Sequence, residues 1–299
     1  MIDPAVGRLT GADTGPGRLP DPAEIFQVCL RVSRGRPRDL AGRKIVVSAG
    51  GTREAIDPVR YIGNRSSGLQ GYALARTAVA RGADVTLVAA NVVLPDPAGA
   101  AVVRVESTAE LREAVLAASG DADVVVMAAA VADFRPAARH DTKIKKTDGE
   151  PEPIRLTKNP DILAELGEHR RRLQAAEALS GSGDAGGVKS GGRDSGDGAG
   201  GDRDGGGGGG RERVRGAYPA VIVGFAAETH DVLANGQAKL ARKRCDLLVV
   251  NQVGDGLAFG TPDNAATVLV AGGDPVEVPF GPKEDLADAV WDLVAARLA

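Results

Sequence analysis

Residues 45–71, Ile-Val-Val-Ser-Ala-Gly-Gly-Thr-Arg-Glu-Ala-Ile-Asp-Pro-Val-Arg-Tyr-Ile-Gly-Asn-Arg-Ser-Ser-Gly-Leu-Gln-Gly, contain the elements that decide the fold. The apolar run 45–49 is followed by two glycines, a pattern that predicts a buried strand. After a long polar loop, residues 70–81 carry apolar side chains at helical spacing. A strand, a loop and a helix in this order form half of a nucleotide-binding unit, and the N-terminus of such a helix suits a phosphate or carboxylate.

The long loop between that strand and that helix favours a ligand-binding role. Ser66, Ser67 and Gly68 allow close approach and offer hydroxyl donors, while Arg60 and Arg65 supply positive charge. The alternative is a solvent-exposed connection whose arginines are merely solvated. Loops of this length are uncommon in compact domains unless they are functional or disordered, and several apolar residues in this one argue against disorder.

The rest of the chain repeats the alternation of apolar runs and helical patterns. Strands are expected at 83–90, 102–105, 123–131, 220–226 and 246–250, with helices at about 107–118, from 231 and at the C-terminus, and a hairpin around 267–278. This order predicts an α/β fold with a doubly wound, mostly parallel, Rossmann-like sheet and an antiparallel edge hairpin.

The chain is expected to form one domain with two less ordered additions. Residues 1–39 read as an extended tail and linker with a short helical pattern at 23–33, and the domain itself should span 40–299. It is interrupted at 180–210 by a stretch of almost pure Gly, Ser, Asp and Ala, which predicts a flexible insertion because it cannot bury enough apolar surface to offset its ordering entropy.

Composition excludes several classes of protein. The net charge of −3 and the 3% aromatic content argue against nucleic-acid binding. No stretch approaches the roughly 18 apolar residues of a membrane helix, and the N-terminus lacks a signal-peptide core. Cys29 and Cys245 are isolated, so neither a disulfide framework nor a metal-ligand spacing is present. A soluble cytoplasmic protein is expected.

A nicotinamide dehydrogenase is the first rival among nucleotide-binding folds. Its fingerprint is G-x-G-x-x-G after the first strand and an acidic residue at the end of the second. Here the first strand is followed by Gly50-Gly51-Thr52, and the second ends in Ala89-Ala90-Asn91. Both differences weaken this rival, and a Walker P-loop is also absent.

Seven blocks, which stand in the same order as in the family, then carry a family resemblance that runs from roughly residue 40 to the end. The chain resembles the phosphopantothenoylcysteine synthetases through Gly51-Thr52-Arg53-Glu54, Asp57-Pro58-Val59-Arg60-Tyr61-Ile62, Asn64-Arg65-Ser66-Ser67-Gly68, Ala129-Ala130-Val131-Ala132-Asp133-Phe134, Lys143-Ile144-Lys145-Lys146, Lys158-Asn159-Pro160-Asp161 and Gly224-Phe225-Ala226-Ala227-Glu228-Thr229. Each block alone is weak, whereas the ordered set is specific.

The resemblance implies a ligase of coenzyme A biosynthesis that works in two steps. The carboxylate of 4′-phosphopantothenate attacks the α-phosphate of CTP to give an acyl-cytidylate, and the amine of L-cysteine then displaces CMP. Mg²⁺ is implied as a cofactor held mainly by the nucleotide phosphates, as is a homodimer with the hairpin region as a plausible contact. Residues 7–26 look like the tail and linker of a flavin-dependent decarboxylase, whose flavin site is not in this chain, so no flavin is expected.

The resemblance also assigns site residues. It implies Asn64, Lys143 and Arg60 as catalytic residues, and Ser66, Ser67, Gly68, Asn64 and Ala129 for phosphopantothenate. For CTP it implies Met127, Ala128, Ala129, Asp133, Lys143, Pro160, Asp161, Ile162, Leu163, Phe225, Lys239 and Lys243. Without the resemblance, the charge run at 143–146 would read as a basic surface loop.

One position departs from the family pattern. Leu69 stands where bacterial members usually carry lysine, so a phosphate contact from that position is lost. Two alternatives therefore stay open beside the ligase: an NAD(P)-dependent Rossmann oxidoreductase, and a nucleotide-binding module with an impaired site.

Overall fold

The computed structural model describes residues 5–8, 13–145, 153–181, 218–228, 232–252 and 261–299. The glycine-rich insertion expected at 180–210 lies outside the described residues from 182 onward. Within the described ranges, no helix has the combination of length and apolarity that crossing a membrane requires.

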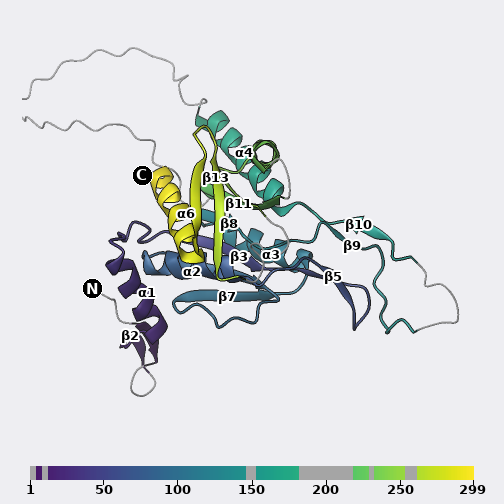
Figure 1. The fold of residues 1–299 in the computed structure, drawn as a ribbon, viewed down its shortest axis with the longest axis horizontal. Coiled ribbons are helices and arrows are strands. Elements are labelled where there is room, and N and C mark those ends of the chain that lie inside the picture. Colours follow the sequence, from purple (N-terminus) through teal and green to yellow (C-terminus); the bar gives the residue numbers. More distant parts are fainter. Residues whose placement is uncertain (1–4, 9–12, 146–152, 182–217, 229–231, 253–260) are drawn as a thin grey trace, which may run out of the picture.

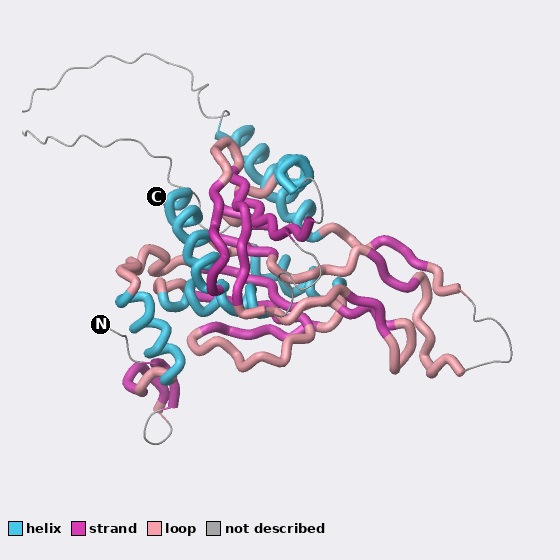
Figure 2. Tube along the Cα trace, in the orientation of Figure 1, coloured by secondary structure: helices cyan, strands magenta, loops and turns pink. Residues whose placement is uncertain are grey.

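An eight-stranded sheet forms the centre of the fold (Figures 1 and 2). Its order is β14 (Val276–Pro282), β13 (Asp263–Val270), β12 (Leu247–Gln252), β11 (Val221–Glu228), β8 (Val124–Met127), β3 (Lys44–Gly50), β6 (Asp84–Ala90) and β7 (Ala100–Val105). The strands from β12 to β7 are parallel, whereas β13 and β14 form an antiparallel hairpin at one edge. The predicted doubly wound sheet with its antiparallel edge is confirmed.

The order of the parallel strands creates a switch point beside β3. The chain first moves outward from β3 to β6 and β7, and then returns to β8 on the other side of β3 before continuing to β11 and β12. Connections that leave in opposite directions open a crevice at the carboxyl ends of the two central strands, and ligands of open α/β sheets bind there.

Helices cover both faces of this sheet (Figure 1). On one face, α2 (Leu69–Ala80) and α6 (Lys283–Leu298) pack against a core that includes Ile45, Tyr72 and Trp291. On the other face, α3 (Thr108–Ser119), α4 (Ile162–Gly181) and α5 (Val232–Lys243) cover a second core that includes Val46 and Ile222. Successive residues of β3 thus serve opposite cores, which explains why the strand reads as continuously apolar.

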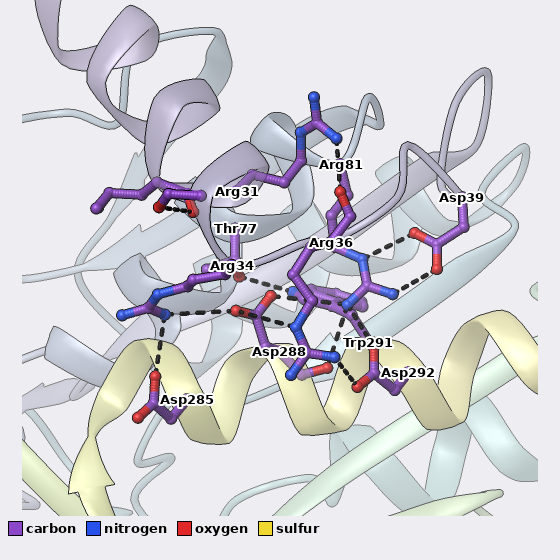
Figure 3. A network of polar contacts seen from close by, with 12 residues as sticks. Arg31, Arg34, Arg36, Asp39, Thr77, Arg81, Asp285, Asp288, Trp291 and Asp292 are labelled. Atoms are coloured by element: carbon purple, nitrogen blue, oxygen red, sulfur yellow. Dashed lines mark hydrogen bonds and ion pairs between the residues drawn. The ribbon is translucent and has the colours of Figure 1, made fainter.

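Ion pairs between side chains hold the N-terminal segment against the domain. The expected tail contains a short hairpin, β1 (Ala5–Arg8) and β2 (Thr14–Arg18), and then α1 (Pro22–Ser33). Beyond α1, Arg34 and Arg36 reach α6, where Arg36 pairs with Asp292 (Figure 3). Arg81, at the end of α2, is 1% exposed and bonds Asp39 and Asp292 at 2.5 and 2.9 Å.

Two small antiparallel strand pairs extend away from the sheet (Figure 1). We call the described residues 53–63, 134–145 and 153–158 together the arm. The pairs are β4 (Arg53–Ala55) with β5 (Tyr61–Gly63), and β9 (Phe134–Pro136) with β10 (Leu156–Lys158). Each strand has only three residues, too few to show the alternation that predicts a strand from sequence.

Candidate active site

A cavity of about 810 Å³ opens at the carboxyl ends of β8 and β11, next to the switch point. It is lined by residues of the 64–65 loop, the segment after β8, the turn before α4, the end of β11 and the last turns of α5: Asn64, Arg65, Met127, Ala129, Ala130, Val131, Ala132, Asp133, Phe134, Lys158, Asn159, Pro160, Asp161, Ile162, Leu163, Phe225, Ala226, Ala227, Lys239, Arg242, Lys243 and Leu248. We call this the main cavity.

The charge of the main cavity is positive. Its lining includes five cationic side chains (Arg65, Lys158, Lys239, Arg242 and Lys243) and two acidic ones (Asp133 and Asp161). Lys243 forms an ion pair with Asp161, which also accepts a hydrogen bond from the N–H of Ala164 in the first turn of α4. The excess of cations suits a polyanionic ligand.

The wall of the main cavity is a short segment after β8 whose backbone is fixed on several sides. Ser48 accepts a hydrogen bond from the N–H of Ala129 at 3.1 Å, and Ala130 bonds Gly50 through backbone atoms at 2.7 Å. Thr52 Oγ1 accepts from the N–H of Ala132 at 2.9 Å. Because the wall is made largely of alanine, a ligand has close access to its backbone.

A second layer of buried polar groups supports this wall. Thr108 donates its hydroxyl proton to Thr52 Oγ1 at 3.0 Å, and both residues have no exposed surface. Asn159 Nδ2 donates to the carbonyl of Ala132 at 2.8 Å, which ties the turn before α4 to the wall. The carboxylate of Glu54 accepts from the N–H of Thr108 at 2.9 Å, at the N-terminus of α3, where a negative charge is favourable.

A smaller cavity of about 150 Å³ adjoins the main one, and we call it the side cavity. The two share Arg65, Ala129, Ala130 and Phe225 among their lining residues. Ser66, Ser67 and Gly68 line the side cavity at the N-terminus of α2. Gly68 has a φ of +79°, and its ideal Cβ would lie 2.8 Å from Val92, so only glycine fits this helix start without strain.

Asp57 organises the base of the arm. Its carboxylate accepts hydrogen bonds from the N–H groups of Val59, Arg60 and Ile144 and from the guanidinium of Arg60. Burial by itself would raise the pKa of Asp57, but these donors hold the pKa well below its usual range. Arg60 also donates to the carbonyl of Ile144 at 2.8 Å, so the loop of Arg60 and the segment of Lys143 are held together.

Most of the residues predicted for the site line one of the two cavities. The main cavity brings together Asn64, Met127, Ala129, Asp133, Pro160, Asp161, Ile162, Leu163, Phe225, Lys239 and Lys243. The side cavity brings Ser66, Ser67, Gly68 and Ala128 to its edge. Arg60 and Lys143 line neither cavity of their own chain and lie exposed on the arm. Their catalytic role stays a prediction.

Several residues of the site were not among those predicted. Lys158, Asn159 and Arg242 line the main cavity, and the first two belong to a block that was already noted. Asn251, Asn264 and Lys283 line the side cavity. They come from β12, β13 and the start of α6, and no local pattern links them to residues 66–68.

Metal ligands do not gather anywhere in the part of the chain that is described. No group of three or more His, Cys, Asp or Glu side chains there could hold an ion. Of the two cysteines, Cys245 is buried, and burial raises the pKa of its thiol to about 11, so it stays protonated at neutral pH.

Comparison with known proteins yields one consistent set of relatives. Residues 40–179 and 212–298 match the family described as the DNA/pantothenate metabolism flavoprotein C-terminal domain. The chain is 45% identical over 308 residues to the coenzyme A biosynthesis bifunctional protein CoaBC of Mycolicibacterium smegmatis, covering 100% of this chain and 64% of the relative. The CoaBC of Bacillus subtilis is 35% identical over 299 residues, covering 99% of this chain and 62% of the relative. The chain therefore spans just under two thirds of the length of these relatives.

The solved structures that resemble this chain include a domain of the same protein, CoaBC, as the sequence relatives. The crystal structure of the C-terminal domain of CoaBC superposes with a TM-score of 0.61 and 30% identity, covering 87% of this chain and 98% of that one. A DNA/pantothenate metabolism flavoprotein from Streptococcus pneumoniae has a TM-score of 0.60 at 20% identity, covering 85% and 99%. The second likeness is one of fold.

Proposed function

We propose that this chain, which belongs to the DNA/pantothenate metabolism flavoprotein C-terminal domain family, is a ligase of coenzyme A biosynthesis that uses CTP to join 4′-phosphopantothenate to L-cysteine. The observation that carries the proposal is the pair of adjoining cavities at the switch point. The larger holds five cationic side chains for a triphosphate, and the smaller holds the start of a helix for a second anion. Two anionic substrates that must react need two such neighbouring sites.

In the first step, a carboxylate oxygen of the substrate forms a bond to the α-phosphorus of CTP, and the bond to pyrophosphate breaks. Lys239 and Lys243, on α5, stabilise negative charge on the phosphates. The fixed alanine wall offers backbone groups to the nucleotide without reorganisation during the reaction. Mg²⁺ would be held mainly by the triphosphate, with Asp133 as a carboxylate of the lining that could add a ligand, and would neutralise charge on the departing pyrophosphate.

In the second step, the amine of cysteine attacks the acyl carbonyl, CMP leaves with the C–O bonding electrons, and the amine loses a proton to form the amide. Asn64 is the residue proposed to orient the carbonyl or the incoming amine. Its Nδ2 donates to the carbonyl of Val131 at 2.9 Å, which holds the side chain at the mouth of the main cavity. Positioning of this kind can account for a large part of the rate of an acyl transfer.

We propose a homodimer as the working form. The edge hairpin β13–β14 exposes Phe280, but more apolar side chains are exposed on the arm, among them Val59, Tyr61, Phe134 and Leu156. Such a surface favours contact with another protein chain. A second copy would also explain how Arg60 and Lys143 act. They line neither cavity of this chain, and in a dimer the arm would bring them to a cavity of the partner.

The ligase proposal predicts pyrophosphate release that depends on phosphopantothenate. The protein is incubated with CTP, Mg²⁺ and 4′-phosphopantothenate, with and without cysteine, and pyrophosphate and CMP are followed. We expect pyrophosphate without cysteine up to about one equivalent per site and sustained turnover with cysteine. No pyrophosphate in either condition would contradict the ligase, and binding of NAD(P)H in its place would favour the oxidoreductase. Repeating the assay with ATP in place of CTP tests which nucleotide the protein uses.

The shared-site proposal predicts complementation between two inactive chains. A chain with Arg60→Ala and a differently tagged chain with Lys243→Ala are co-expressed, and the mixed dimer is purified through both tags. If the arm completes the partner's cavity, one of the two sites in the mixed dimer is intact, and we expect about half of the wild-type turnover. A mixed dimer as inactive as its parents would mean that each site takes both residues from one chain, which contradicts the shared site. A monomer in sedimentation would contradict the dimer itself.

A further inference from the structure

Lys283, the first residue of α6, is in an unfavourable place for a cation. The residue lines the side cavity although it is only 5% exposed. The positive end of the α6 dipole adds to the cost of holding an ammonium group there. Burial lowers the pKa of Lys283, and the nearby carboxylates of Asp263 and Glu284 offset this only in part. Its Nζ donates a hydrogen bond to the backbone carbonyl of Asp263 at 3.1 Å, an uncharged acceptor.

Two polar groups near Lys283 lack hydrogen-bond partners within the part of the chain that the structure describes. Gln70 Nε2 donates to the carbonyl of Lys283 at 3.1 Å, which brings the starts of α2 and α6 together. The side-chain oxygens of Gln70 and Asn251 are both buried and have no hydrogen-bond partner among the described residues. Gln70, Asn251 and Asn264 all line the side cavity with Lys283. Buried polar groups are normally satisfied, so their convergence here indicates a ligand with polar groups of its own.

The side cavity needs a cation if it binds an anion. Leu69, the first residue of α2, lines it with an apolar side chain, and Ser66 and Ser67 are uncharged. Arg65 lines both cavities, so it is not specific to this one. Lys283 is the remaining cation of the side-cavity lining, and it faces a cavity whose edge carries the N-termini of two helices.

We propose that Lys283 binds the phosphate monoester of the acyl substrate. It thereby selects the phosphorylated acid over the same acid with a free hydroxyl group in place of the phosphate. This rests on the proposed function, because it is the ligase reaction that brings a phosphorylated carboxylic acid to the site. The substrate then lies across the shared alanine wall, with its phosphate in the side cavity and its carboxylate in the main one. The side-chain oxygens of Gln70 and Asn251, which have no partner among the described residues, then accept hydrogen bonds from hydroxyl or amide groups next to the phosphate.

The test compares Lys283→Met with Arg76→Met. Methionine matches the length of lysine and removes a buried charge, so we expect the first variant to fold at least as stably as the wild type. Arg76 is the matched control, since it pairs with Glu284, the neighbour of Lys283, but does not line the side cavity. Calorimetric titration with 4′-phosphopantothenate, pantothenate and CTP gives three dissociation constants for each protein without requiring turnover.

We expect Lys283→Met to weaken 4′-phosphopantothenate binding about 10- to 100-fold, as expected for a lost charge-assisted contact to phosphate. Its affinities for pantothenate and CTP, and all three affinities of Arg76→Met, should stay within about twofold of wild type. Equal weakening of CTP would mean that Lys283 serves the nucleotide, and unchanged 4′-phosphopantothenate binding would overturn the proposal. A wild-type protein that binds 4′-phosphopantothenate through Lys283 but releases no pyrophosphate would refute the ligase and leave the phosphate site standing.

Discussion

An Arg81→Met variant is expected to lose about 3–5 kcal/mol of the free energy of unfolding, the usual cost of breaking a buried ion pair by removing one partner. Arg81 is 1% exposed and contacts Asp39, Asp288 and Asp292 (Figure 3). Asp288, which is itself only 8% exposed, loses a contact of 3.7 Å with the guanidinium and keeps contacts of 3.5 and 3.9 Å to Arg34 and Arg36. Denaturant unfolding at neutral pH measures the loss.

The pH dependence of this loss distinguishes an electrostatic cause from simple loss of packing. Burial raises the pKa of Asp288 already in the wild type, against the lowering effect of nearby arginines. Removing Arg81 should raise this pKa further. A carboxyl whose folded-state pKa is raised contributes stability below that pKa, and the contribution is lost as pH rises through it. The deficit of Arg81→Met should therefore shrink as the pH falls from neutral through the raised pKa of Asp288.

Arg104→Met is the control for Arg81→Met. Arg104 pairs with Asp96 at 2.8 Å, but both side chains are about half exposed, so we expect a change of at most about 1 kcal/mol. If both variants lost the same free energy of unfolding, or if the deficit of Arg81→Met did not change with pH, the buried ion pairs of Arg81 would not stabilise the fold electrostatically.

The sheet was predictable because its strands are buried on both faces. The run at 45–49 became β3, and the runs at 83–90 and 246–250 became β6 and β12 within two residues at each end. The run at 123–131 was different, since β8 ends at Met127 and the following alanines leave the sheet to form the cavity wall. Apolarity alone cannot separate these two roles, because small side chains suit both a buried strand and a surface where ligand meets backbone.

Site residues that lie within the short sequence blocks were predictable. Site residues that come together only through the packing of distant segments were not. Asn64 and Asp161 were found in such blocks, and both line the main cavity. Lys283 was missed because it lies more than 200 residues beyond residues 66–68 in the sequence and meets them only through the packing of α6 beside α2. The sequence placed Asp57 in one of these blocks without indicating its role, because the hydrogen bond that it accepts from the N–H of Ile144 depends on a contact across the arm.

A Lys143→Ala variant is expected to lose about 10²- to 10³-fold in kcat for the ligase reaction, with a smaller change in KM for CTP. The reason is that a cation near the transferred phosphate and the reacting carbonyl stabilises charge that develops in the transition state more than charge already present in the bound substrate. Single-turnover release of pyrophosphate measures the first step separately from the second. Lys145→Ala is the matched control, because Lys145 is an exposed lysine two residues away on the same segment.

Asp57 extends this prediction to the geometry of the arm. An Asp57→Ala variant keeps Lys143 but removes the carboxylate that holds the N–H of Ile144 and the guanidinium of Arg60. If the ammonium group must be held in place to act, this variant should lose much of the same kcat while its KM for CTP stays close to wild type. Full activity in Asp57→Ala together with a large loss in Lys143→Ala would mean that the ligand itself orders the segment. Full activity in both would remove Lys143 from the mechanism, and the cations of α5 would then have to stabilise the transition state alone.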